Sequence, residues 1–118
     1  MVGIVLGAPD NRDTRREFVD GSTRSYTRLG SASVGLGVYQ PGWRWSLHAG
    51  PQTGKPAANH IGYVITGAMR VQDAEGRERE IGAGFAFEVG PGHDAWVVGT
   101  EPCTALDFTP VVTDSTEA

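Results

Sequence analysis

Hydrophobic and polar residues alternate along much of the chain with the two-residue period of β-strands. In Ser33–Tyr39, two valines and a leucine alternate with glycines, and Pro41-Gly42 then predicts a turn. Further strands are predicted at residues 42–48, 60–67, 68–71, 77–81, around Phe85 and Phe87, at 95–98 and at 103–108, with a loop at 49–59. No stretch shows the period of a helix of ordinary length. The pattern therefore predicts an all-β fold.

Two of the predicted strands carry histidines. In the first, Gly42–His48, the tryptophans and Leu47 would share one face, while Arg44, Ser46 and His48 share the other. In the second, His60 shares a face with Gly62, Val64 and Thr66. If both histidine faces point into one barrel, the two imidazoles meet in a partly apolar cavity, where neutral rings are good ligands for a divalent metal.

Length and composition fit a single small domain. The chain has 118 residues, with 17 glycines and 7 prolines spread along it rather than concentrated in one segment. An antiparallel sheet this rich in glycine must bury one face and protect its edges, which sandwiches and barrels both achieve. We expect one domain over residues 1–118, a barrel core at about 34–108 and a flexible tail at 110–118.

Charge and hydropathy argue against two classes of partner. The formal net charge is −4 and no dense basic cluster occurs, so nucleic acid and anionic membranes are not expected as partners on electrostatic grounds. The N-terminal arginines alternate with acidic residues, which predicts a solvated surface; they are Arg12, Arg15, Arg16, Arg24 and Arg28. The opening apolar run is too short for a signal peptide core, so a cytoplasmic protein is expected. The single cysteine, Cys103, is expected to pack in the core.

Two short motifs resemble those of a known family. Gly42, His48 and Gly67 follow the first cupin motif, with His60 in place of the family glutamate and Gly50 in place of its second histidine. In the second motif Gly84, Pro91 and Gly92 follow the pattern, Ala95 stands at the metal histidine, and His93 lies two residues earlier. From about Val34 to Phe108 the chain resembles the small single-domain cupins, which include the RmlC-like conserved barrels.

The resemblance implies a fold and a site. The fold is the cupin-type antiparallel β-barrel, a double-stranded β-helix or jelly roll. The implied site is a divalent transition metal (Zn, Fe, Mn or Ni) held by His48, His60 and His93, with one position open for water or substrate. The alternative is a metal-free ligand cavity in which His48 and His60 are hydrogen-bonded imidazoles.

Five further residues are candidates for ligand binding. Arg44 and Ser46 share the histidine face, and a buried Arg44 would need an acidic partner or an anionic ligand. Tyr63, Phe87 and Trp96 are aromatic residues that could line a cavity or simply fill the core. Cys103 and Glu88 are not predicted to do chemistry, and no catalytic residue is assigned.

These observations leave several functions open. The first is a barrel that binds a small organic molecule, with metal-dependent dioxygenase, isomerase or cyclase chemistry as the enzymatic version implied by the resemblance. The second is a non-catalytic sensor or accessory dimerisation module without metal. The third is a purely structural dimer. A homodimer is expected, with a strand at Ile4–Leu6 pairing with a second subunit.

Overall fold

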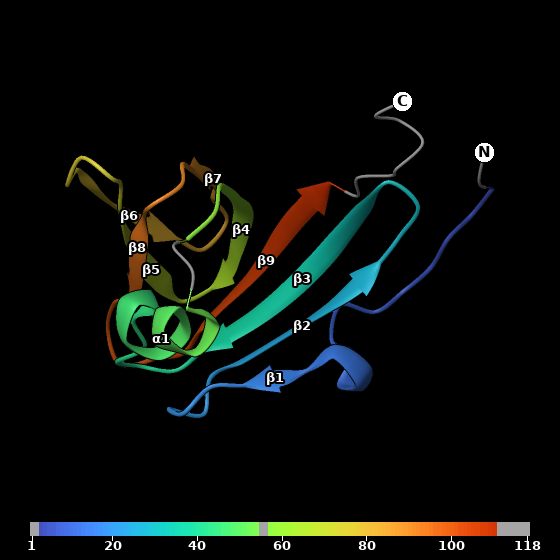
Figure 1. Cartoon of the computed structure of the whole chain (residues 1–118), viewed down its shortest axis with the longest axis horizontal. Helices are drawn as coiled ribbons and strands as arrows, with labels where there is room; N and C mark the ends of the chain where they lie inside the picture. Colours follow the sequence, from blue (N-terminus) through green and yellow to red (C-terminus); the bar gives the residue numbers. More distant parts are fainter. Residues whose placement is uncertain (1–2, 55–56, 111–118) are drawn as a thin grey trace.

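The chain forms two antiparallel β-sheets that face each other (Figure 1). The computed structural model describes residues 3–54 and 57–110. One sheet has six strands in the order β1-β2-β3-β9-β4-β7, and the other has three in the order β6-β5-β8. In chain order the strands are β1 (Arg16–Glu17), β2 (Thr23–Arg28), β3 (Ala32–Tyr39), β4 (His60–Thr66), β5 (Ala68–Gln72), β6 (Glu78–Gly82), β7 (Ala86–Val89), β8 (Asp94–Val97) and β9 (Cys103–Pro110).

The predicted all-β antiparallel fold is confirmed, and seven of its strands match predicted ones closely. Strands β1 and β2 were not predicted, because their mixture of arginines, serines and threonines is typical of a solvated surface. In the structure β2 pairs with β3 along its whole length, from Thr23 opposite Val38 to Arg28 opposite Ser33. The sheet therefore begins well before residue 34, and Arg24 lies inside it rather than on a mixed-charge surface.

The prediction of a strand over Gly42–His48 is wrong. Only Arg44 forms a β-bridge, with Trp96, and a π-helical turn, η2 (Trp45–Ala49), follows at once. The backbone N–H groups of Leu47 and His48 both donate to the carbonyl of Arg44, at 3.0 and 2.8 Å. The side chain of His48 accepts from the N–H of Arg44 at 2.9 Å, which closes the same turn. These local bonds replace the ladder that a strand would need.

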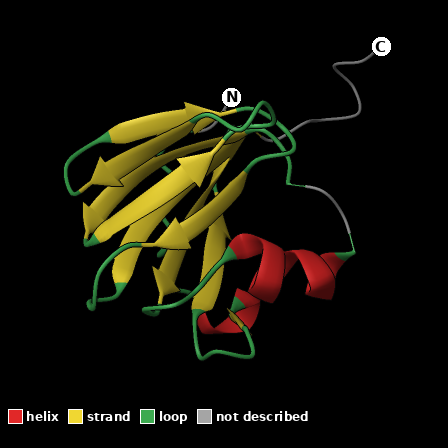
Figure 2. Ribbon diagram, turned by 90° about the vertical axis from the view of Figure 1, so that its left-hand side faces the viewer, coloured by secondary structure: helices red, strands yellow, loops and turns green. Residues whose placement is uncertain are grey.

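Part of the predicted loop at 49–59 is also helical. The short helix α1 (Gly50–Thr53) continues from η2 and ends at Gly54, which has a left-handed φ of +68°. Pro51 in the first turn suits a helix start, since its missing N–H would have no partner there. Figure 2 shows these helical segments gathered at one end of the strands.

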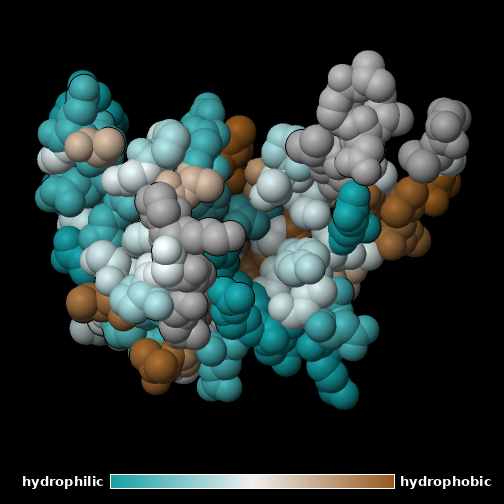
Figure 3. Space-filling model, viewed as in Figure 1, coloured by the Kyte–Doolittle hydropathy of each residue, from teal (hydrophilic) through white to brown (hydrophobic). Residues whose placement is uncertain are grey.

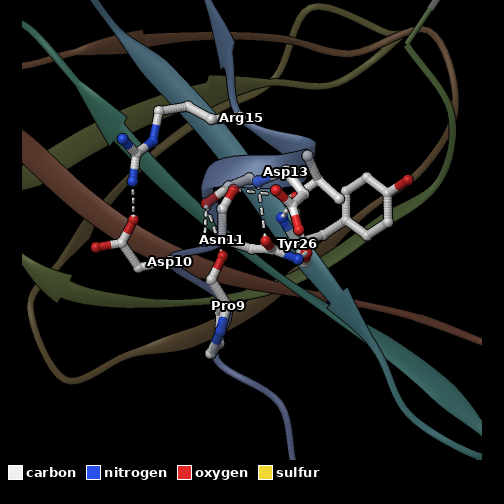
Figure 4. Close-up of polar contacts among 8 residues, drawn as sticks. Pro9, Asp10, Asn11, Asp13, Arg15 and Tyr26 are labelled. Carbon is white, nitrogen blue, oxygen red and sulfur yellow. Dashed lines mark hydrogen bonds and ion pairs between the residues drawn. The ribbon is translucent and has the colours of Figure 1, made fainter.

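A short turn near the N-terminus is tied to β2 by side-chain hydrogen bonds (Figure 4). This turn, η1 (Arg12–Thr14), is capped by Asn11, whose side chain accepts from the N–H of Asp13 and donates to the carbonyl of Tyr26. The Thr14 hydroxyl donates to the Tyr26 carbonyl and accepts from its N–H, both at 2.8 Å. The turn therefore has a fixed position beside the edge of the six-stranded sheet.

The core lies between the inner faces of the sheets. Val64 and Cys103 are fully buried, and Trp43, Met69 and Val71 are nearly so. Burial raises the pKa of the Cys103 thiol to about 11, so the thiol stays protonated at neutral pH. The predicted packing role of Cys103 is confirmed.

The outer face of the six-stranded sheet carries partly exposed apolar side chains. Ile61, Tyr63 and Ile65 of β4 and Phe108 of β9 are each about two-fifths exposed. Residues 4–6 were predicted to form a strand, but they have no regular secondary structure, and Ile4 and Leu6 are 89% exposed. Figure 3 shows hydrophobic residues over this N-terminal segment. Within the described residues, no helix is long and apolar enough to span a membrane.

Candidate functional site

A cavity of about 250 Å³ lies between the two sheets. Both sheets contribute to its wall, together with η2 and the segment that precedes β4. Its lining residues are Arg24, Tyr39, Trp43, Trp45, Ala57, Ala58, Asn59, His60, Met69, Val71, Phe87, Val89, His93, Ala95, Ala105, Leu106, Asp107 and Thr109. The polar groups gather near β2, β9 and the start of β4, while β5, β7 and β8 supply apolar side chains. The cavity is therefore polar at one end and apolar at the other.

Two glycines of β3 make room for the polar end. Gly35 and Gly37 are buried on the inner face, and the register places Gly35 opposite Asp107 and Gly37 opposite Arg24. A Cβ atom on Gly35 would lie 1.9 Å from an Asp107 carboxylate oxygen. A Cβ on Gly37 would lie 2.3 Å from the Tyr39 hydroxyl. Only glycine leaves the space that these polar side chains occupy.

An ion pair crosses above β3. Arg24 Nη2 of β2 lies 2.8 Å from Asp107 Oδ2 of β9, and the Asp107 side chain is only 19% exposed. Burial acts to raise the pKa of Asp107, but His60 and Arg24 together outweigh it, so the pKa lies below its usual value. Burial raises the pKa of Tyr39, against the opposing charge of Arg24. At neutral pH the cluster therefore holds a carboxylate, a guanidinium and a neutral phenol.

His60 extends the cluster toward the cavity. Its Nε2 lies 3.4 Å from Asp107 Oδ2, yet this buried nitrogen has no hydrogen-bond partner within the described residues. The ring packs edge-on against Phe87, with ring centres 5.6 Å apart. The same Asp107 oxygen lies 2.8 Å from Arg24, and its 3.4 Å separation from Nε2 is beyond good hydrogen-bond distance. A ligand atom placed at this end of the cavity would supply the missing partner.

His93 faces His60 across the cavity, with ring centres 6.0 Å apart. The side chain is buried, and Nδ1 lies 2.9 Å from the carbonyl oxygen of Gly90. This carbonyl can only accept, so Nδ1 carries a proton and the other ring nitrogen is left as an acceptor in the neutral form. Burial and the neighbouring His60 lower the pKa of His93, against the opposing effects of Gly90 and Asp94. His93 is thus a neutral imidazole at neutral pH.

The candidate residues from the sequence fall into two groups. The structure places His60, His93 and Phe87 in the cavity wall. Tyr63 lies on the outer face of β4, and the remaining candidates also lie outside the wall; these are Arg44, Ser46, His48 and Trp96. In the segment after Gly42, it is Trp43 and Trp45 that line the cavity, which reverses the expected orientation. The roles of His60, His93 and Phe87 in ligand binding stay predictions.

The polar side chains excluded from the cavity form a separate structural cluster. Asp94 accepts from Arg44 Nε at 3.0 Å and from both the N–H and the hydroxyl of Ser46, at 3.0 and 2.8 Å. The Arg44 guanidinium also stacks on Trp96, 4.2 Å from the ring centre. Arg44 therefore has an acidic partner, although its side chain is 39% exposed rather than buried. This cluster fixes η2 against β8.

The described residues do not fit the metal site implied by the resemblance. Within the part of the chain that the structure describes, no group of three or more histidine, cysteine, aspartate or glutamate side chains is arranged to hold a metal ion. His48 is engaged in its own helical turn and does not line the cavity. Asp107 lies beside His60, but its oxygen is already paired with the cation Arg24. A guanidinium and a metal ion would compete for the same carboxylate.

Five polar residues of the cavity were missed from sequence: Arg24, Tyr39, Asn59, Asp107 and Thr109. One signal was present in the predicted last strand, where Cys103, Ala105 and Asp107 share a parity and the first two are small and apolar. An acidic residue on such a face points to a buried carboxylate. No comparable signal marked Arg24, whose position depends on the pairing of β2 with β3.

Solved structures share this architecture. The chain aligns with KdgF from Halomonas sp. at a TM-score of 0.62 and 20% identity, over 93% of this chain and 99% of that one. An RmlC-like cupin from Shewanella frigidimarina gives 0.60 and 17%, over 86% of each chain. The Cnp3 cupin domain from Schizosaccharomyces pombe gives 0.57 and 16%, over 81% of this chain and 63% of that one.

The chain has a cupin fold. The barrel expected from the two motifs is thereby confirmed. The sequence matches no protein-family model and no curated protein. At these identities the likeness to other cupins concerns the fold alone, and the function of this cupin barrel has to be argued from its own cavity.

The close approach of polar side chains to the glycines of β3 gives a first prediction. In Gly35→Ala the new methyl group displaces the Asp107 carboxylate from Arg24, so the free energy of unfolding should fall by about 1–3 kcal/mol. Gly82→Ala is the matched control, because a Cβ there meets no atom within 4 Å, and its effect should stay within about 0.5 kcal/mol. Urea unfolding of both variants measures the difference. Equal losses of unfolding free energy in the two variants would show that Asp107 is not tightly packed against Gly35.

His93 gives a prediction about pH. Its pKa is lowered in the folded state, so the unfolded chain takes up the proton first as the pH falls through 6.5. The stability that the neutral ring contributes is complete above pH 6.5 and is lost as the pH falls toward the lowered value. Between about pH 7 and 5, the free energy of unfolding should therefore fall more in the wild type than in His93→Gln. Parallel urea titrations test this, and identical pH slopes would contradict it.

Proposed function

We propose that this cupin barrel binds a small organic molecule in the cavity between its sheets. The observation that carries the proposal is the lining, in which a fixed polar cluster stands at one end of a largely apolar cavity. Such a combination is typical of ligand sites, where apolar walls supply affinity and a few polar groups set orientation. The volume of about 250 Å³ favours a compact ligand.

The polar end defines which ligand groups are favoured. His60 Nε2 lacks a hydrogen-bond partner within the described residues, and the free nitrogen of a neutral His93 is an acceptor. The two ring centres lie 6.0 Å apart, so one polar group of a ligand in the cavity can reach both imidazoles. A hydroxyl group suits this position, since it can donate to one nitrogen and accept from the other.

The apolar end favours a hydrocarbon or aromatic portion. Met69, Val71 and Ala95 come from the three-stranded sheet, and Phe87 and Val89 come from β7. The Trp43 ring lies against Tyr39 of the polar cluster, with ring centres 4.3 Å apart, and adds an aromatic face to the cavity wall. A ligand with one hydroxylated end and one apolar end would match both parts of the lining.

We propose that binding does not depend on a metal. The resemblance implies a divalent ion at His48, His60 and His93, yet His48 lies outside the cavity wall and Asp107 is paired with Arg24. We therefore assign no metal-dependent dioxygenase, isomerase or cyclase step to these residues. The two cavity imidazoles and the Asp107 carboxylate can still form hydrogen bonds with a bound ligand or accept a proton from it.

The accessory-module alternative is supported by a different surface. The apolar side chains of Ile61, Tyr63, Ile65 and Phe108 form a partly exposed face on neighbouring strands β4 and β9. Such a face is typical of protein contacts. A homodimer through this face is compatible with ligand binding in the cavity, and it stays a proposal, as does a cytoplasmic location.

Filling the cavity tests the proposal. Ala105→Leu adds apolar volume inside the cavity without removing a polar group, and Thr104→Leu places the same side chain on the opposite face of β9 as the control. In saturation-transfer NMR with a library of small organic molecules, hits should bind the wild type and Thr104→Leu but not Ala105→Leu.

The same samples should be analysed for metals after incubation with Zn²⁺, Fe²⁺, Mn²⁺ and Ni²⁺. The proposal expects ligand hits that persist after chelation. Two results would overturn it: hits that are unchanged in Ala105→Leu, or stoichiometric metal that disappears in His60→Ala and on which every hit depends.

A further inference from the structure

A second cavity, of about 410 Å³, lies on the other side of the Arg24–Asp107 ion pair. It shares Arg24, Asp107 and Thr109 with the main cavity, so the ion pair forms the partition between the two spaces. Its other walls come from β1, β2, β3 and the turn η1. None of its residues belongs to the metal motifs, and only Arg24, Asp107 and Thr109 are shared with the proposed ligand site.

The charge of this cavity is opposite to that of the whole chain. Arg16 and Arg24 line it with a single carboxylate, that of Asp107, whereas the chain as a whole carries −4. Arg24 is already paired with Asp107 at 2.8 Å. Arg16 is exposed and has no ion-pair partner within the described residues, so its charge is available to a ligand.

Hydroxyl groups complete the wall. Within the described residues, the hydroxyls of Tyr26, Ser33 and Thr109 make no hydrogen bond, although all three residues line the cavity. A hydroxyl next to a cation can donate to an anionic oxygen, and charge-assisted bonds of this kind are stronger than neutral ones. The wall is therefore rich in donors, and its one carboxylate is already occupied.

The backbone of part of this wall is also held in place. The Thr14 hydroxyl is bonded to both backbone groups of Tyr26, and the Ser25 hydroxyl donates to the Pro9 carbonyl at 2.6 Å. Asn11 adds a bond to the Tyr26 carbonyl (Figure 4). These contacts position η1 and the Tyr26 backbone before any ligand arrives, which reduces the entropy cost of binding.

We propose that the second cavity is an oxyanion-binding site, which takes a carboxylate or phosphate group through Arg16 and the hydroxyls of Tyr26, Ser33 and Thr109. Arg24 contributes positive potential from the partition while it stays paired with Asp107. Of the four proposed contact residues, only Thr109 also lines the main cavity. A ligand that occupied both spaces would place its acidic group here.

The test is an NMR titration of the isotope-labelled full chain with inorganic phosphate and, separately, with acetate, at neutral pH. Sodium chloride keeps the ionic strength constant. The reporters are the backbone amide signals of Tyr26, Ser33 and Gly35, with the Met69 amide as the reporter of the main cavity. Arg16→Gln removes the available cation, and Arg12→Gln is the control, because it makes the same charge change in η1 outside the cavity wall.

One of the two anions should give saturable shifts at Tyr26, Ser33 and Gly35, and the tighter one identifies the group that the site prefers. Arg16→Gln should weaken this binding about tenfold, as expected for the loss of a charged hydrogen-bond donor. Arg12→Gln should change it by less than about twofold. Ser33→Ala gives a second, uncharged test and should also weaken binding.

The proposal is overturned if neither anion gives saturable shifts at these amides, or if Arg16→Gln and Arg12→Gln weaken binding equally. The second result would indicate only a general effect of surface charge. Shifts confined to the Met69 amide would place the anion in the main cavity and would also overturn it. None of these results bears on whether the main cavity binds a neutral ligand.

Discussion

One ion pair determines how the interior of this barrel is arranged. It crosses the inner face of β3 at a point where β3 has only glycines. Arg24 of β2 reaches Asp107 of β9 across β3, where Gly35 and Gly37 leave the space free. Both charges are partly withdrawn from water, so removing either partner would leave the other without compensation. Hydrophobic burial stabilises the rest of the core, but this pair sets where the polar end of the cavity lies.

Several features follow from the pair. His60 and Arg24 together keep the pKa of Asp107 below its usual value, while His60 Nε2 has no hydrogen-bond partner within the described residues. The ion pair also separates two spaces of different character. The main cavity has two imidazoles and apolar walls, whereas the second cavity has arginines and hydroxyls. Among its described residues, this cupin barrel thus has imidazoles, an ion pair and hydroxyls in its interior rather than a cluster of metal ligands.

Local alternation was enough to predict most strands and the all-β class, whereas the cupin barrel was expected from the resemblance of the two motifs. Alternation also placed His60 and Val64 on one face of a strand, and in the structure this face points inward, although a register irregularity between Val64 and Thr66 interrupts the pairing of β4 with β9. It failed after Gly42, where Trp43, Trp45 and Leu47 also alternate. The carboxylate of Asp94, distant in the sequence, bonds to Ser46 and Arg44 and stabilises a helical turn instead. Periodicity carries no information about such a distant partner.

The Arg24–Asp107 pair could not be predicted from periodicity for the same reason. Which residue lies opposite Gly35 depends on the register of three strands, and β2 was not predicted at all. The most direct test is a double-mutant cycle of Arg24→Gln and Asp107→Asn, measured as the free energy of unfolding in urea at neutral pH. We predict a coupling energy of about 1–3 kcal/mol between the two sites, with each single variant less stable than the wild type. Losses that add to within about 0.5 kcal/mol would contradict this prediction, because the two charges would then act independently.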